Sequence, residues 1–185
     1  GFHLKDGSSL VDDFKIVSQE THSKNEKWET VWGEERYINN QHNDLLIKLE
    51  QVSTKRLLDI RFRLFNYGLG FRYEFPEQPN LGNFVIIDEI TEFAMAGDHI
   101  AHWIPGDYRT QEYNYTTSKL SEIKSLFKKA ATYNVSQQTF SETGVQTALQ
   151  MKTEGGLYIN IHEAACVDFP TMHLELKEDT FTFST

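Results

Sequence analysis

The stretch Trp103–Leu120, WIPGDYRTQEYNYTTSKL, holds the residues of this chain whose types and spacing best suit binding chemistry. A Pro-Gly turn is followed by a single glutamate, Glu112, set among Tyr108, Tyr113 and Tyr115. Tyrosine joins an apolar ring to a hydroxyl, which suits sugar rings and is equally common in loop packing. Loops fixed on a sheet often carry binding residues. Glu112 is therefore either a ligand-binding carboxylate or an ordinary solvated one.

A second candidate is the pair His162-Glu163 in YINIHEAA. Adjacent side chains of an extended strand point to opposite faces, so the pair could line one pocket only if the chain bends there. A His-Glu-x-x-His zinc motif is excluded because position 166 is cysteine. We expect His162 to be structural. Cys166, the only cysteine, excludes an internal disulfide, and its apolar neighbours favour a buried small residue over a nucleophile.

Composition excludes several classes of partner. The 185 residues include 27 acidic and 18 basic ones, giving a formal net charge of -9. So acidic a chain repels phosphate backbones, and we expect no binding to nucleic acid or to a membrane surface. No apolar run approaches the ~20 residues that span a bilayer. The opening residues, GFHLKDGSSL, show no signal peptide.

The elements that must position these residues are mostly strands, because the hydrophobic period is mostly two. RLLDIRFRLFNYGLGFRYEF, residues 56–75, predicts a hairpin that turns at Asn66–Gly70. Further strands are expected at 45–52, 83–89, 91–97, 99–105, 144–153, 156–164, 172–178 and in the closing DTFTFST. Ser118–Ala130 is the exception, since Leu120, Ile123, Leu126 and Phe127 share one helical face. The loop 106–117 then carries Glu112.

Strands at this spacing, with one amphipathic helix near 118–130, predict an all-β protein with a β-sandwich architecture. No internal repeat or low-complexity linker divides the chain, so one domain is expected over residues 1–185. The residues by themselves provide no complete catalytic constellation.

Several long motifs in order resemble a known family: VWGEERYINN, RFRLFNYGLGFRYEFP, GDHIAHWIPGDYRTQEYNYTTSKLSEI, FSETGVQTALQMKT and GLYINIHEAACVDFPTMHL. From about Trp28 onward the chain resembles the N-terminal domain of glycoside hydrolase family 97, in particular the starch-utilisation α-glucosidases of gut bacteria. The resemblance implies a β-super-sandwich of the galactose mutarotase type. It also implies a (β/α)8 catalytic barrel elsewhere in the full-length chain as the partner of this domain, and a periplasmic location.

The resemblance assigns roles to a few residues. The glutamate of its TQEY motif is a calcium ligand, which here is Glu112. Calcium takes six to eight oxygen ligands, so one carboxylate cannot hold it, and we expect the isolated domain to bind calcium weakly or not at all. The residues Tyr133, Asn134 and Val135 are expected to face the substrate, an α-glucan oligosaccharide.

Three functions follow. The first is the non-catalytic N-terminal domain of a calcium-dependent α-glucosidase acting on malto-oligosaccharides, which completes the active site and is not active alone. The second is an autonomous carbohydrate-binding module that stacks sugars on Trp103 and the loop tyrosines. The third is a mutarotase-like epimerase with His162 and Glu163 as acid and base.

Overall fold

The computed structural model describes residues 1–133 and 137–185, which form two compact units, Gly1–Glu89 and Ile90–Thr185. Within these residues the chain is nearly all β, as predicted, with a single α-helix. None of the helices in the described ranges is long and apolar enough to span a membrane. Whether residues 1–185 act as one domain stays a prediction.

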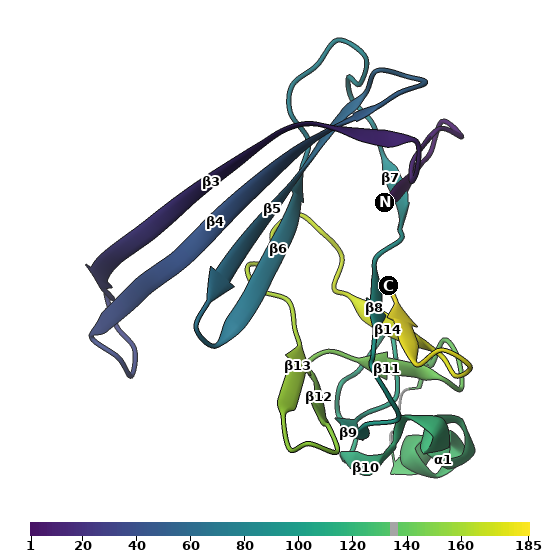
Figure 1. Cartoon of the computed structure of the whole chain (residues 1–185). Helices are drawn as coiled ribbons and strands as arrows, with labels where there is room; N and C mark the ends of the chain where they lie inside the picture. The colour runs from purple at the N-terminus through teal and green to yellow at the C-terminus, as the bar shows by residue number, and fades with distance from the viewer. Residues whose placement is uncertain (134–136) are drawn as a thin grey trace. The chain divides into compact units, whose positions relative to one another are not determined.

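The first unit contains two sheets (Figure 1). A three-stranded sheet has the order β2-β1-β7, with β1 at Phe2–Leu4, β2 at Ser9–Leu10 and β7 at Ile86–Glu89. An antiparallel meander follows the chain order, with β3 at Phe14–Glu29, β4 at Tyr37–Gln51, β5 at Leu57–Phe65 and β6 at Gly68–Glu74. Side chains from both sheets share a core that includes Phe2, Leu4, Leu10 and Leu58.

The hairpin predicted at residues 56–75 is confirmed as β5 and β6. Its register places Phe62 opposite Phe71, with the ring centroids 6.1 Å apart. The turn between Phe65 and Gly68 is only two residues long, so the glycines Gly68 and Gly70 lie within β6. The alternation of apolar residues thus predicted both strands, and the turn begins at Asn66 as expected but ends at Tyr67 rather than at Gly70.

The long strand β3 was not predicted. Its sequence, FKIVSQETHSKNEKWE, is mostly polar, and most of its residues are exposed. It forms because its backbone pairs with β4 along nearly its whole length, from Phe14–Gln51 to Glu29–Tyr37. The third strand, β5, pairs with β4 only from Asn43 onward, so β3 and β4 extend beyond it as a two-stranded ribbon (Figure 1).

The second unit also contains two four-stranded sheets, in the orders β10-β9-β12-β13 and β11-β14-β15-β8. Their strands are β8 Glu92–Ala94, β9 Ile100–Trp103, β10 Thr116–Lys119, β11 Gly144–Gln146, β12 Leu149–Lys152, β13 Tyr158–Ile161, β14 His173–Lys177 and β15 Thr182–Ser184. The helical segments are η1 Leu120–Glu122, α1 Ile123–Ala130 and η2 Ala131–Tyr133, of which the first and last are 3-10 helices.

The predicted amphipathic helix is present, and its apolar face joins the core of the second unit. Leu120, Ile123 and Phe127 are buried together with side chains from both sheets. The helical segment starts at Leu120 rather than Ser118 because Thr116–Lys119 pair with β9. At its start, the carboxylate of Asp98 accepts a 2.9 Å hydrogen bond from the backbone N–H of Ser121, which satisfies one of the free donors at a helix N-terminus.

The predicted β-super-sandwich of the galactose mutarotase type is wrong. The described strands form four separate sheets of three or four strands, divided between two units. Alternation shows which side chains share a face but not which strands pair. Residues 144–153, predicted as one strand, break at Thr147-Ala148 into β11 and β12, and these pair in different sheets.

Candidate functional site

The loop that carries Glu112 connects β9 to β10, which are neighbours in one sheet. Its base is closed where Trp103 pairs with Thr116, and Trp103 is fully buried. The indole N–H of Trp103 donates a 3.0 Å hydrogen bond to Oγ of Ser118. The two ends of the loop are therefore held at a fixed separation by the core of the second unit.

Asp107 organises the interior of this loop. Its side chain is 2% exposed and accepts four hydrogen bonds. The backbone N–H groups of Arg109 and Thr110 donate to Oδ1 at 2.7 and 3.2 Å. The Tyr113 hydroxyl and the backbone N–H of Gln138 donate to Oδ2, each at 2.7 Å. One carboxylate thus ties the loop to itself and to the segment after the helix.

The hydrogen bonds decide the charge state of Asp107. Burial by itself would raise the pKa of the Asp107 carboxyl, but the donors from Arg109, Tyr113, Gln138 and Thr110 outweigh it and hold the pKa below its usual value. Burial, and then the hydrogen bond to the Asp107 carboxylate, raise the pKa of Tyr113. At neutral pH the site therefore contains an ionised Asp107 and a protonated Tyr113.

Two further contacts hold the first half of the loop. The side-chain amide of Gln146 donates to the carbonyls of Pro105 and Thr110 at 3.0 and 2.7 Å. The ring of Phe140 lies so close to Gly106 and Gly144 that a Cβ on either glycine would overlap it. Glycine is required at both positions because only hydrogen atoms leave room for the ring.

Glu112 lies on this loop as expected, and its residue is exposed. Its backbone N–H donates a 3.1 Å hydrogen bond to Oγ1 of Thr110, and the next residue, Tyr113, is buried. In the described part of the chain no group of three or more His, Cys, Asp or Glu residues could hold a metal ion. A calcium ion bound to Glu112 would need its other oxygen ligands from outside these residues.

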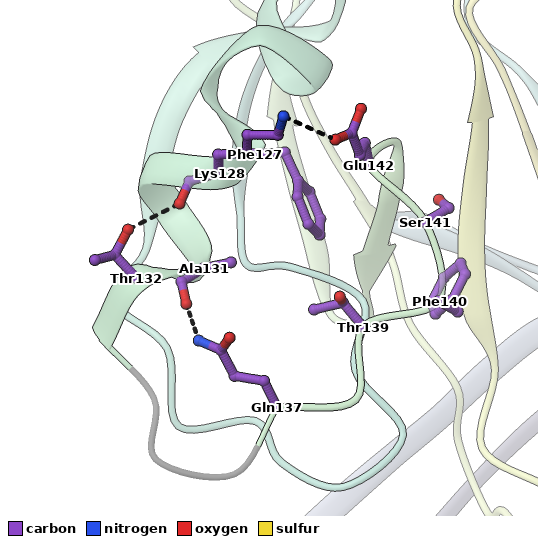
Figure 2. A pocket seen from close by; sticks show the side chains of 9 residues that line it. All are labelled: Phe127, Lys128, Ala131, Thr132, Gln137, Thr139, Phe140, Ser141 and Glu142. Atoms are coloured by element: carbon purple, nitrogen blue, oxygen red, sulfur yellow. Dashed lines mark hydrogen bonds and ion pairs between the residues drawn. The ribbon is translucent and has the colours of Figure 1, made fainter.

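The expected substrate residues lie only partly within the described structure. Tyr133 is the last residue of η2, whereas Asn134 and Val135 lie outside the described residues. A pocket of about 520 Å³ lies nearby, between the end of α1 and residues 137–142 (Figure 2).

Several polar side chains of this pocket already interact with neighbouring groups. Nζ of Lys128 is 3.6 Å from Oε1 of Glu142. The Thr132 hydroxyl donates to the carbonyl of Lys128, and the Gln137 amide donates to the carbonyl of Ala131 (Figure 2). These groups have less capacity left for a ligand than unpaired ones would.

His162 and Glu163 line one pocket, contrary to the expectation from strand alternation. The strand β13 ends at Ile161, so the two residues follow it in irregular structure and the opposite-face rule does not apply. The pocket has a volume of about 330 Å³ and is also lined by Gln111 and Tyr115 of the loop. Cys166 lines it too and is exposed, so the expectation of a buried cysteine is wrong.

Two predicted roles change with these positions. Trp103 is part of the core and cannot stack on a sugar, while Tyr108 and Tyr115 remain exposed. Asp107 was missed entirely. The only signal in the sequence is its residue type directly after the Pro-Gly turn, because Asp side chains often accept hydrogen bonds from backbone N–H groups two residues on.

Comparison with known proteins gives consistent matches. The family described as Glycosyl-hydrolase 97 N-terminal matches residues 1–184, so the match also covers the first 27 residues, which resembled the family poorly by sequence motifs. Solved structures of a glycoside hydrolase family 97 enzyme from Pseudoalteromonas sp. strain K8, one in complex with acarbose and one variant in complex with panose, are 32% identical with a TM-score of 0.83. Each of these matches covers 100% of this chain and 25% of the Pseudoalteromonas chain.

A more distant structure shows the same fold. A beta-arabinopyranosidase is 13% identical with a TM-score of 0.76, and the match covers 100% of this chain and 28% of that one. The chain thus spans about a quarter of the length of the solved proteins that it matches.

Proposed function

The chain belongs to glycoside hydrolase family 97 and corresponds to the N-terminal domain of the enzymes in that family. On this basis we propose that the domain completes the active site of a calcium-dependent α-glucosidase. The substrate class is malto-oligosaccharides. The domain is not catalytic by itself, and the reaction takes place in a (β/α)8 barrel elsewhere in the full-length chain. Its contribution is one calcium ligand, Glu112. The parent enzyme acts in the periplasm.

The observation that carries this proposal is an exposed carboxylate on a loop that the protein interior holds in place. Asp107 and Gln146 together hold this loop through six hydrogen bonds, four of which reach the backbone on the N-terminal side of Glu112. A ligand presented in this way loses little conformational freedom when it binds a metal ion. The complexes of the Pseudoalteromonas enzyme with acarbose and panose support an α-glucan oligosaccharide as substrate.

Glu112 fits calcium by its chemistry. Its carboxylate is the kind of oxygen donor that calcium prefers, and its exposure leaves it accessible to ligands from another domain. When bound, the ion supplies a fixed positive charge that can polarise an oxygen atom and orient a sugar hydroxyl or water. Asp107 keeps the loop, and hence the position of Glu112, unchanged while this occurs.

The test uses the full-length enzyme that carries this domain. Glu112→Gln keeps the size of the side chain and removes its charge, so we expect the calcium concentration for half-maximal turnover of maltose to rise by at least about tenfold. Glu154→Gln, at an exposed turn of the same unit, is the matched control. If both variants keep the calcium dependence of the parent, Glu112 is not a ligand.

The module hypothesis predicts a different result. It requires the 185-residue domain to bind malto-oligosaccharides by itself, and its proposed platform residue Trp103 is buried. Calorimetric titration of the domain with maltotriose distinguishes the two hypotheses, since the proposal made here predicts no binding tighter than millimolar.

A further inference from the structure

The pocket of about 330 Å³ beside the Glu112 loop is assigned no role by the family match or by the calcium proposal. It lies wholly within the second unit, and three separate segments form it. Gln111 and Tyr115 come from the loop, Thr147 and Ala148 from the break between β11 and β12, and His162 from the segment after β13. Its volume falls at the lower end of the range of about 300–1,000 Å³ for small-molecule sites.

The segment that follows β13, residues 162–172, forms one side of the pocket and is held in place by hydrogen bonds. Oε2 of Glu163 accepts a 2.6 Å hydrogen bond from the backbone N–H of Met172, which closes the segment between them. The Thr147 hydroxyl donates to the carbonyl of the same Met172 at 3.3 Å. The segment also contains Ala165 and Asp168 in the left-handed region, each with φ of 54°. The pocket is therefore preformed rather than a gap between mobile side chains.

The lining chemistry suits a neutral polyol. Gln111, Tyr115 and His162 offer donors and acceptors, and Oε1 of Glu163 makes no hydrogen bond within the described part of the chain. Ile104 and Ala148 supply apolar surface. The described residues that line it include no Lys or Arg, and Glu163 repels anions, which disfavours a phosphorylated ligand. A sugar ring has hydroxyl groups that can hydrogen-bond to such polar side chains and an apolar face that can pack against such apolar surface.

We propose that this pocket binds one glycosyl unit of the oligosaccharide substrate. The identity of the sugar rests on the proposed function, because Gln111 directly precedes Glu112 and so places the pocket next to the proposed calcium ligand. The site makes the N-terminal domain a determinant of substrate binding as well as a source of a metal ligand. Gln111, Tyr115 and His162 are its sugar-binding residues.

Cys166 provides a local probe, since its thiol is exposed and it lines the pocket. In the full-length enzyme, the rate of its alkylation by iodoacetamide is followed by peptide mass spectrometry with and without acarbose, an α-glucan mimic. We expect saturating acarbose to slow alkylation by at least about fivefold, because a bound ring covers the thiol. An unchanged rate at saturation overturns the proposal.

Calorimetry with acarbose is the second measurement and does not depend on thiol access. Gln111→Ala and Tyr115→Phe are each expected to raise the dissociation constant about fivefold to tenfold, the effect of one lost hydrogen bond. Tyr158→Phe is the matched control, because this exposed tyrosine of β13 lies outside the pocket. If the pocket variants bind as the control does, the pocket is not a sugar site.

The two proposals fail separately. If Glu112→Gln leaves calcium dependence unchanged while acarbose still protects Cys166, the metal role is wrong and the sugar site stands. If Glu112→Gln raises the calcium concentration for half-maximal turnover while the pocket variants bind acarbose normally, the metal role stands and the sugar site is wrong.

Discussion

The hydroxyl of Tyr113 donates a 2.7 Å hydrogen bond to Oδ2 of Asp107, and both side chains are buried. This bond spans the turn that presents Glu112. Tyr113→Phe keeps the ring and removes only the donor. Hydrogen bonds to charged groups contribute about 1.5–3 kcal/mol, so we expect the free energy of unfolding to fall by about that amount in urea denaturation.

Tyr108→Phe is the control for this substitution. Tyr108 belongs to the same loop and is exposed, so its variant should change the free energy of unfolding by less than about 0.5 kcal/mol. Equal losses in the two variants would show that the Tyr113 hydroxyl has no special role.

The ionised state of Asp107 predicts a dependence of stability on pH. Its folded-state pKa lies below the value of about 3.9 for an ordinary aspartate. The stabilisation is therefore fully present above that value and is lost as the pH falls through the folded-state pKa. Asp107→Asn should lower stability at neutral pH and make the loss below about pH 4 less steep. Urea denaturation over this pH range measures both effects.

The matched control for pH is Asp179→Asn, which removes one negative charge at an exposed turn position. It should leave the steepness of the acid loss close to that of the parent. The same steepness in Asp107→Asn and the parent would mean that Asp107 contributes nothing to the acid transition.

Sequence patterns predicted the local elements well where apolar residues repeat with a regular period. Ile123 and Phe127 mark the buried face of α1, with the helical period of 3.6. In the hairpin, Phe62 and Phe71 share the apolar face with a period of two, although Phe71 is 39% exposed in this structure. Both elements could therefore be predicted without any structure.

Pairing between strands could not be predicted in the same way. The polar strand β3 is stabilised mainly by backbone hydrogen bonds to β4, which leave no apolar period in the sequence. Likewise, the division of residues 144–153 between two sheets depends on distant partners, His173–Glu175 for β11 and Tyr158–Ile161 for β12. Long-range pairing decided the architecture, and this is why the β-super-sandwich prediction was wrong.

The candidate site was predicted only where it depends on local sequence. A loop position for Glu112 followed from the Pro-Gly turn and the helix that comes after it. The shared pocket of His162 and Glu163 could not be anticipated, because it depends on β13 ending at Ile161 rather than at Ala164. Strand ends are the least certain part of any assignment from sequence.

Gly106→Ala should destabilise the loop although Gly106 has an ordinary backbone conformation. A Cβ there would overlap the ring of Phe140 and lie 3.0 Å from the backbone of Gly144. Overpacking of this kind costs about 1–3 kcal/mol. Gly155→Ala, where the added atom meets only Oγ1 of Thr153 at 3.9 Å, is the matched control. Thermal unfolding compares the two, and similar midpoints would show that Phe140 can move aside freely.

Arg61 should contribute more to stability than an exposed arginine does. It donates to Asp44 at 2.6 Å and to both oxygens of Glu74 at 2.7 and 3.3 Å, and Asp44 is buried. Arg61→Met keeps the aliphatic stem but leaves these carboxylates with fewer donors, so we expect a loss of about 1–3 kcal/mol in urea denaturation. Arg36→Met breaks an exposed pair with Glu29 and should cost less than about 1 kcal/mol. A loss for Arg61→Met no larger than that for Arg36→Met would show that Arg63, Arg72 and solvent satisfy the carboxylates of Asp44 and Glu74 without Arg61.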